Sequence, residues 1–329
     1  MSPTPDLTYY PDSRPGIRRR RCGRGFSYTA PDGTRIDDSA ERARIGALAV
    51  PPAYEDVWIC PQANGHLQAT GRDARARKQY RYHPEWTAFR AERKYGHLAP
   101  FGAALPGVRR AILTQLRERD PGDKAFALAA TLALLDRAGL RVGNADYAKE
   151  NGSYGATTLR GTHLRLDGST LRLNFPGKGG KRVRKVLKDR TLERALTRLD
   201  DLPGRALIAW LDEEGTPHTL RSEEINLWLA ERTGDAQITA KTFRTWNGSV
   251  AALEAAQRAQ KSSTTISIKT MAEAAAERLA NTPTVARNSY IHPEVIALAK
   301  SGLPPRLDTA PERAGLRRTE AQLLALLGG

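Results

Sequence analysis

The stretch 163–187, HLRLDGSTLRLNFPGKGGKRVRKVL, is the part of this sequence that decides the expected fold. Within it, apolar and polar residues alternate, which is typical of half-buried β-strands, and Asp167-Gly168 is a strong signal for a tight hairpin turn. The glycines around Lys178 indicate a second turn. We therefore expect a small antiparallel sheet in which Lys178 occupies a flexible turn between two strands.

The segments on both sides of this stretch have the periodicity of helices. Apolar residues recur at a spacing of three and four residues, which indicates amphipathic helices. The chain after about residue 90 is therefore predicted to be a mainly helical domain, 91–329, that contains the small sheet. We expect its tail after Pro304 to be a loose segment that ends in a short helix. The segments predicted as helices are 107–118, 123–140, 222–233, 240–260 and 268–280.

The first 90 residues have the pattern of a small, mainly β domain. GFSYTAPDGTRI (25–36) predicts two strands around an Asp-Gly turn, and 54–60 and 66–73 predict further short strands around an Asn-Gly turn. The pattern changes after KQYRYHPEW (78–86), which places a domain boundary close to the ninetieth residue. The expected fold class is α+β, with this β-rich domain, 1–90, followed by the mainly helical domain.

The charge of the chain indicates a polyanion as its partner. It has 52 Lys and Arg against 36 Asp and Glu, a formal net charge of +16, and such an excess favours nucleic acid through counterion release. An anionic membrane is the second candidate, although no apolar run approaches the length of a membrane span. With 2 cysteines, neither a disulfide framework nor a structural zinc site is expected, which fits a reducing cytoplasm.

Two basic stretches of the N-terminal domain are candidates for phosphate contacts. The arginine run 17–26 is expected to be a solvated electrostatic footprint. In RARKQYRYHPEW (75–86), Lys78 and its basic neighbours alternate with Tyr80 and Tyr82, so that one strand offers phosphate contacts together with aromatic rings facing a groove. Burial of the two tyrosines in a core is equally compatible with the sequence.

Several basic residues of the C-terminal domain have sequence environments that indicate a bound anion. Arg141 follows a strongly apolar helix, where a guanidinium that cannot lose its charge needs an anionic partner. Lys178 in its glycine turn can reach into a groove and donate a proton. Lys241 and Arg244, three residues apart on one helical face, repel each other unless an anion lies between them. A structural salt bridge for Arg141 and plain solvation for Lys178 are the simpler interpretations.

Tyr290 ends the polar stretch TPTVARNSY (282–290) and is either a packing residue or a nucleophile. A tyrosine nucleophile needs cations for a phosphate and a proton donor for the leaving group, and the residues above supply both. The sequence has no paired-carboxylate cluster, His-rich metal box or Walker-type loop beside these cations. Chemistry at Tyr290 is therefore expected to need no metal, no ATP and no other cofactor.

Taken in order, these motifs resemble the type IB DNA topoisomerases, specifically the small poxvirus-like branch found in bacteria. The resemblance covers nearly the whole chain, and the ordered set is far more specific than any single motif. The motifs are GIRRRRCGRGFSY (16–28), ARKQYRYHPEW (76–86), RVGNADYAKENGSYGATTL (141–159), FPGKGGK (175–181), KTFRTW (241–246) and NTPTVARNSY (281–290).

The resemblance implies roles for five residues of a catalytic domain of the tyrosine recombinase/topoisomerase IB type. Tyr290 would be the nucleophile, Arg141 and Arg244 would clamp the phosphate, and Lys178 would be the general acid. The family usually has a histidine nine residues before its tyrosine, and Asn281 stands in that place here. An amide can donate a hydrogen bond to a phosphate oxygen but cannot ionise, so we expect Asn281 to bind the phosphate only.

The resemblance also implies an activity and a partner. A type IB topoisomerase relaxes supercoiled duplex DNA by transient single-strand cleavage through a 3′-phosphotyrosyl intermediate, strand rotation and religation. We expect a monomer that clamps double-stranded DNA, without membrane attachment, in the cytoplasm and associated with the nucleoid. The residues expected to contact DNA are Lys78, Gln79, Tyr80, Tyr82, Tyr147 and Lys241.

Two other functions are compatible with parts of the sequence. A tyrosine recombinase uses nearly the same arginine, lysine and tyrosine set, but it commonly has a histidine where Lys241 stands, and it would assemble as a tetramer on paired sites. A basic DNA-binding or chromatin-organising protein without activity would bind tightly and cleave nothing. Asn281 is the feature that favours this second alternative.

Overall fold

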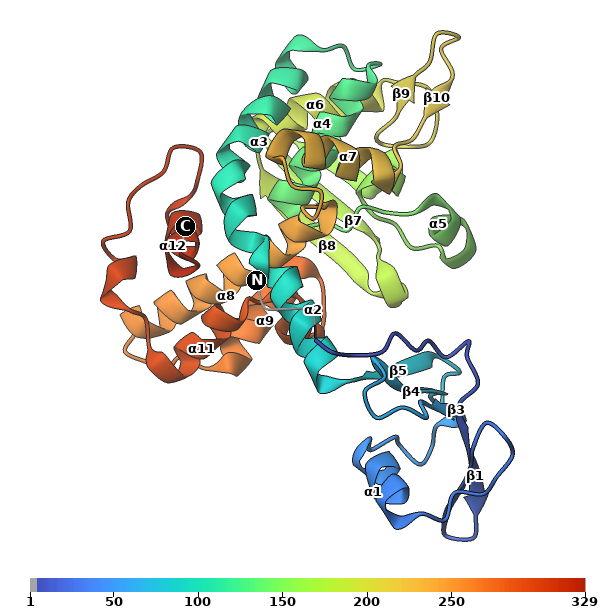
Figure 1. Ribbon diagram of the computed structural model, residues 1–329. Helices are drawn as coiled ribbons and strands as arrows, with labels where there is room; N and C mark the ends of the chain where they lie inside the picture. Colours follow the sequence, from blue (N-terminus) through green and yellow to red (C-terminus); the bar gives the residue numbers. More distant parts are fainter. Residues whose placement is uncertain (1–4, 329) are drawn as a thin grey trace. The chain divides into compact units, whose positions relative to one another are not determined.

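The computed structural model describes residues 5–328. The chain divides into two compact units, Met1–Tyr95 and Gly96–Gly329, and most of their helices and strands are labelled in Figure 1. Helix α2 (Pro84–Gly96) spans this division. The domain boundary that the sequence indicates, near residue 90, lies inside the same helix.

The N-terminal unit is built on a five-stranded antiparallel sheet with the strand order β2-β1-β3-β4-β5. Buried apolar residues from the strands and from helix α1, including Ile45, Val57 and Ile59, form its small core. The elements are β1 (Ile17–Cys22), β2 (Gly25–Thr29), α1 (Ser39–Ala47), β3 (Glu55–Ile59), β4 (Leu67–Arg72) and β5 (Lys78–Tyr82).

The two-stranded hairpin predicted within 25–36 does not form in full. Only its first strand, β2, is present, and it pairs with the residues after the turn through a single bridge between Thr29 and Arg35. The partner of β2 is instead β1, the arginine-rich run. An arginine run can join the sheet because Arg18, Arg20 and Arg21 are exposed and the half-buried Arg19 has partners. The Arg19 guanidinium lies 4.2 Å from the ring centre of Phe26 and donates hydrogen bonds to main-chain carbonyls.

The C-terminal unit is mainly helical and contains the three-stranded antiparallel sheet β6-β7-β8 that the stretch 163–187 predicts. The α+β class is thereby confirmed. Short 3-10 turns lie at Ala156–Thr158, Gly161–His163, Lys178–Gly180 and Pro305–Leu307. The strands are β6 (Leu164–Asp167), β7 (Thr170–Pro176), β8 (Arg182–Lys188), β9 (Trp210–Leu211) and β10 (Pro217–His218). The helices are α3 (Leu98–Glu118), α4 (Lys124–Ala138), α5 (Ala145–Asn151), α6 (Arg190–Asp200), α7 (Ser222–Thr233), α8 (Ala240–Lys261), α9 (Ile268–Leu279), α10 (Pro283–Tyr290), α11 (Pro293–Ser301) and α12 (Arg318–Leu326).

The core of the C-terminal unit is packed around α8. Most residues of this helix are buried, and it contacts α3, α4, α7, α9, α10, α11 and α12. Its Phe243 and Trp246 meet Phe101 of α3 edge to face, with ring centres 4.9 and 5.9 Å apart. Gly102 permits this approach, because a Cβ there would lie 2.4 Å from the Trp246 ring. These contacts fix α8, which carries Arg244, in the middle of the core.

The tail after Pro304 is part of this core, which corrects the expectation of a loose segment. Leu307 is buried, and so is Glu320 of α12. The guanidinium of Arg109, from α3, donates hydrogen bonds of 2.8 to 2.9 Å to Glu320 and to Asp136 of α4. The helical pattern of α12 is visible in the sequence, but nothing there indicates that a buried arginine 211 positions away binds this helix.

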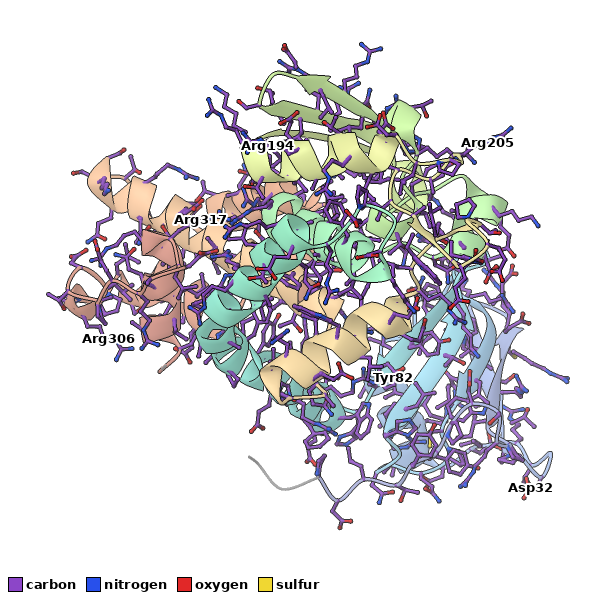
Figure 2. All side chains as sticks on the ribbon, turned by 90° about the horizontal axis from the view of Figure 1, so that it is seen from above. Asp32, Tyr82, Arg194, Arg205, Arg306 and Arg317 are labelled. Carbon is purple, nitrogen blue, oxygen red and sulfur yellow. The ribbon has the colours of Figure 1, made fainter. Side chains whose placement is uncertain are left out.

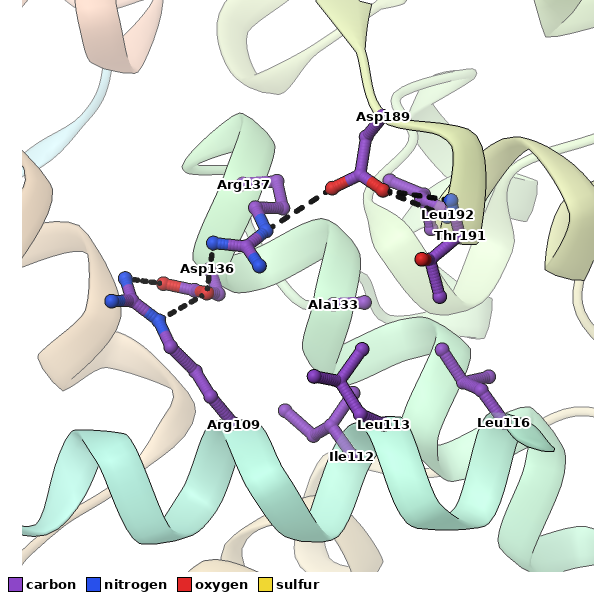
Figure 3. Close-up of a pocket in the computed structure, with 10 residues that line it drawn as sticks. All are labelled: Arg109, Ile112, Leu113, Leu116, Ala133, Asp136, Arg137, Asp189, Thr191 and Leu192. Atoms are coloured by element: carbon purple, nitrogen blue, oxygen red, sulfur yellow. Dashed lines mark hydrogen bonds and ion pairs between the residues drawn. The ribbon is translucent and has the colours of Figure 1, made fainter. Parts of the chain in front are cut away.

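Figure 3 shows how this ion cluster continues toward α6. Arg137 lies 3.4 Å from Asp136 and 3.2 Å from Asp189. Asp189 in turn begins α6 by accepting hydrogen bonds from the N–H groups of Thr191 and Leu192. Charged groups therefore join α3, α4, α6 and α12 across an otherwise apolar interior.

Removal of the Glu320 carboxylate tests the role of this cluster in folding. Burial opposes the charged form of Glu320, but the hydrogen bonds from Arg109 hold its pKa at about 2. Because Glu320→Ala leaves the Arg109 charge buried with fewer partners, we expect it to lower the free energy of unfolding by about 3 kcal/mol, measured by urea unfolding. The exposed Glu312→Ala is the control, with a change within about 0.5 kcal/mol. Equal, small effects of the two variants would contradict this role.

Candidate active site

Tyr290 is the last residue of α10, a short helix that begins at the Thr282 cap. Its side chain is half-buried. Its main chain lies against α8 at Gly248, where a Cβ would come within 2.4 Å of the Tyr290 carbonyl oxygen. The Arg244 guanidinium, one turn earlier on α8, lies 4.8 Å from the Tyr290 ring centre. Helix α8 therefore supplies both a cation beside Tyr290 and the glycine that admits its backbone.

Arg244 is 3% exposed and is held by the ends of two other helices. Its Nη1 donates to the carbonyl of Gly139, just after α4, at 2.5 Å, and its Nη2 donates to the carbonyl of Leu279, the last residue of α9, at 3.1 Å. A cation is favoured at these positions because the last carbonyls of a helix carry partial negative charge. Burial and the charge of Arg141 lower the pKa of Arg244 to about 10, so it stays charged at neutral pH.

Arg141 and Asn281 lie next to each other, although they are far apart in the sequence. Arg141 Nη2 donates to Asn281 Oδ1 at 2.6 Å. Because this bond occupies the amide oxygen, the amide nitrogen of Asn281 is the group left to bind a ligand. Asn281 is 6% exposed, and its Nδ2 has no hydrogen-bond partner among the described residues; the same is true of Arg244 Nε. Buried donors without partners are uncommon in folded proteins, so the site has two donors in place for an acceptor.

The charges around Tyr290 change its acidity. Burial raises the pKa of the phenol, but Arg244, Arg141 and Lys241 together lower it by more, so that the pKa is below its ordinary value. Lys241 is exposed at the start of α8, one turn before Arg244. The site therefore stabilises the phenolate, the more nucleophilic form, relative to an ordinary tyrosine.

Lys178 lies at the turn between β7 and β8, in the position that the sequence predicts. Its side chain is exposed. It lines a cavity of about 480 Å³ together with Arg141, Asn144 and Tyr147, and Tyr147 is itself exposed on α5. The structure thus brings Arg141, Arg244, Asn281 and Tyr290 together, and it places Lys178 and Tyr147 at a cavity that Arg141 also lines.

The predicted DNA contacts of the N-terminal unit all lie on the edge strand β5. Lys78, Tyr80 and Tyr82 alternate along it and share one face, whereas Gln79 points to the other face. Tyr80 and Tyr82 are 49% and 42% exposed, and their rings stack with centres 6.1 Å apart. They are therefore not core residues. Lys78 pairs with Asp12 at 2.5 Å.

Sequence reasoning missed the groups that hold the site residues in place. Arg244 is oriented by main-chain carbonyls, which every residue type carries, so no motif indicates them. Asn247 is a second case. Its Nδ2 donates to the carbonyls of Asp136 and Phe243, and its Oδ1 accepts from Arg278. The only available signal for Asn247 in the sequence was an amide one turn after Arg244, inside a predicted helix.

Residues 5–328 include no cluster of three or more His, Cys, Asp or Glu side chains that could hold a metal ion. No helix in the same part of the chain has the length and apolar character needed to cross a membrane. Long basic side chains, among them Arg194, Arg205 and Arg306, extend from the C-terminal unit into solvent (Figure 2).

Comparison with known proteins finds one similar sequence and one solved structure that is similar over part of the chain. The chain is 28% identical over 291 residues to a DNA topoisomerase 1B of Acanthamoeba polyphaga mimivirus, which covers 84% of this chain and 85% of that protein. A crystal structure of a XerH site-specific recombinase bound to a palindromic difH substrate, in a post-cleavage complex, matches with a TM-score of 0.35. It has 15% identity over 59% of this chain and 49% of that chain.

Two family models match consecutive parts of the sequence. The N-terminal domain of bacterial DNA topoisomerase IB matches residues 25–73. The catalytic core of eukaryotic DNA topoisomerase I matches residues 84–301, which is more than half of the chain and includes the whole cluster around Tyr290. The resemblance inferred from the motifs is thereby confirmed, and the chain belongs to the type IB DNA topoisomerases.

Proposed function

We propose that this protein relaxes supercoiled duplex DNA by cleaving one strand through a 3′-phosphotyrosyl link to Tyr290, letting the strand rotate, and resealing it. Membership of the type IB family supports DNA as the substrate. The observation that carries the assignment of the site is the cluster of Arg244, Arg141 and Asn281 around Tyr290. Its two unpartnered donors are suited to the oxygens of a phosphodiester.

The cluster would act on the charge that develops during the reaction. As Tyr290 attacks phosphorus, negative charge grows on the non-bridging oxygens, where Arg141, Arg244 Nε and Asn281 Nδ2 bind it more strongly than in the ground state. Loss of one such donor should cost about 2.7–4 kcal/mol of transition-state stabilisation. These groups are fixed by the fold before DNA binds, so they need little reorganisation.

The bonds and protons balance with solvent water as the only other reactant. The Tyr290 hydroxyl gives its proton to water, the Oη–P bond forms and the P–O5′ bond breaks. Lys178 donates a proton to the departing O5′, which leaves as a hydroxyl group, a contribution of about 10²–10⁴-fold. Resealing is the reverse: the 5′ hydroxyl returns its proton to Lys178 and attacks phosphorus, the Oη–P bond breaks, and the released Tyr290 phenolate takes a proton from water. Because the phosphotyrosyl link conserves the bond energy, no ATP is required.

We further propose that six residues contact DNA away from the reacting phosphate. Tyr147 and Lys241 lie in the C-terminal unit near the cluster, and the shared face of β5 carries Lys78, Tyr80 and Tyr82. Gln79 is the sixth residue that we propose to contact DNA. We propose that the protein acts as a monomer that clamps duplex DNA at the nucleoid. The net charge of +16 supports tight, salt-dependent binding.

Relaxation of a negatively supercoiled plasmid in EDTA without ATP tests this function. We expect the parent protein to relax the plasmid and Tyr290→Phe to lose all relaxation, because phenylalanine has no oxygen to form the phosphoester. Tyr9→Phe, which removes a hydroxyl from an exposed tyrosine, is the matched control and should relax normally. Tight binding by the parent without relaxation would instead favour the chromatin-protein alternative.

The role of Asn281 can be tested with a substitution that preserves its shape. Asn281→Asp keeps an oxygen for Arg141 but replaces the amide donor by an anion, so single-turnover cleavage at saturating enzyme should slow by about 10²–10³-fold. Asn281→His restores a donor and should be much less impaired than Asn281→Asp. The exposed Asn151→Asp makes the same charge change and should cleave at the parent rate. Parent-like cleavage by Asn281→Asp would rule out the donor role.

The acidity of Tyr290 gives a pH-dependent prediction. Because Lys241 is one of the cations that lower the Tyr290 pKa, its neutralisation should raise that pKa and reduce the phenolate fraction at a given pH. The rising limb of the pH profile for single-turnover cleavage should therefore move to higher pH in Lys241→Gln. Lys269→Gln removes the same charge from an exposed site at the start of α9 and should leave the profile in place. A profile that is unchanged in Lys241→Gln would contradict the electrostatic account.

A further inference from the structure

The turn that carries Lys178 is compact, but its own residues do little to aim the lysine. Gly177 N–H donates to the Lys181 carbonyl at 2.8 Å, and Gly180 N–H donates to the Gly177 carbonyl at 3.1 Å. Gly179 and Gly180 have φ of +73° and +74°, a region that glycine occupies without strain. The turn joins β7 to β8, and β8 is an edge strand of its sheet. β8 pairs with β7 along one edge, and its other edge has no strand partner in this sheet, so contacts from outside the sheet can contribute to the position of Lys178.

Two lysines on the β8 side of the turn bind the end of α9. Lys181 Nζ donates to the main-chain carbonyl of Asn281. Lys185 Nζ donates to the carbonyls of Arg278, at 2.5 Å, and Glu277, at 3.2 Å. The last carbonyls of a helix have no partner inside the helix and carry partial negative charge. The end of α9 is thus a natural docking point for ammonium groups.

The environment of Lys185 disfavours the charged form of its ammonium group. Burial and the charges of Arg278 and Arg244 lower its pKa to about 8. The carbonyl contacts offset part of this cost. Lys185 and Gly177 also line one small pocket together with Arg141 and Arg244. The turn and the adjoining part of β8 therefore face the same pocket as the two arginines that we assign to the phosphate.

We propose that Lys185 and Lys181 are positioning residues that dock the β7–β8 hairpin on the end of α9, and that this docking places Lys178 at the leaving oxygen. The inference rests on the proposed role of Lys178 as general acid. It has a simple geometric consequence: the segment that presents Asn281 to the phosphate also anchors the turn that presents Lys178 to O5′. The two ends of the breaking P–O5′ bond are thereby aligned by one anchor.

DNA substrates with two different leaving groups can distinguish a role of Lys185 in positioning Lys178 from a role in stabilising the fold as a whole. An alkoxide needs a proton in order to leave, whereas a thiolate, whose conjugate acid has a pKa of about 8.5, leaves without one. A DNA duplex with sulfur in place of the bridging 5′ oxygen therefore bypasses the general acid. It still requires Tyr290 and the phosphate clamp. Single-turnover cleavage of matched oxygen and sulfur duplexes is the measurement.

We expect Lys185→Met to cleave the oxygen duplex about 10–100-fold more slowly than the parent, because a misplaced acid loses most of its contribution. On the sulfur duplex it should cleave within about twofold of the parent rate. Lys188→Met makes the same substitution at an exposed position of β8 and should match the parent on both duplexes. Lys185→Met added to Lys178→Met should slow the oxygen reaction no further, because the acid is already absent.

Equal slowing of Lys185→Met on both duplexes, or no slowing on the oxygen duplex, would overturn the inference. If Lys185→Met does not fold, as judged by circular dichroism, Lys181→Met at the more exposed anchor undergoes the same test with the same expected results. Failure of the proposed function is distinguishable. In that case Lys178→Met itself would not be rescued by sulfur, or Tyr290→Phe would still cleave.

Discussion

The geometry of the candidate site depends on the Arg244 guanidinium, which binds the carbonyls of Gly139 and Leu279. These carbonyls belong to the ends of α4 and α9, and in each case a site residue follows two positions later: Arg141 after Gly139, and Asn281 after Leu279. One buried cation on α8 therefore sets the distance between two other groups that we propose to bind the phosphate. The same guanidinium lies beside the Tyr290 ring, so its charge also acts on the proposed nucleophile.

The rest of the C-terminal unit explains why this cation stays in place. Asn247, one turn after Arg244, binds the carbonyl of Asp136 on α4 and the side chain of Arg278 on α9, so it joins the same three helices. Asp136 in turn belongs to the ion cluster with Arg109 that reaches α12. The site is thus the end of a continuous polar network inside an apolar core, where unpaired groups are costly and geometry is well defined.

Much of the fold and the five proposed site residues could be predicted from the sequence, for identifiable reasons. The strands within 163–187 follow from alternation, and α4 and α8 follow from long apolar periodicity. The site residues follow from ordered motifs. The pairing of β2 with an arginine-rich strand, the burial of the tail through Glu320, and the docking of Lys185 could not be predicted, because each depends on a partner far away in the sequence. Charged residues are usually solvated, and the sequence does not mark the exceptions.

The measurement that tests the central claim most directly is identification of the residue that becomes attached to DNA. The protein would be denatured during turnover of a plasmid, digested with trypsin and nuclease, and its peptides sequenced by mass spectrometry. Cleavage after Arg287 and Lys300 isolates the peptide 288–300, in which Tyr290 is the one tyrosine. The account predicts a nucleotide joined to Tyr290 through its 3′ phosphate. A nucleotide on any other residue, or an unmodified 288–300 peptide from protein that relaxes DNA, would contradict it.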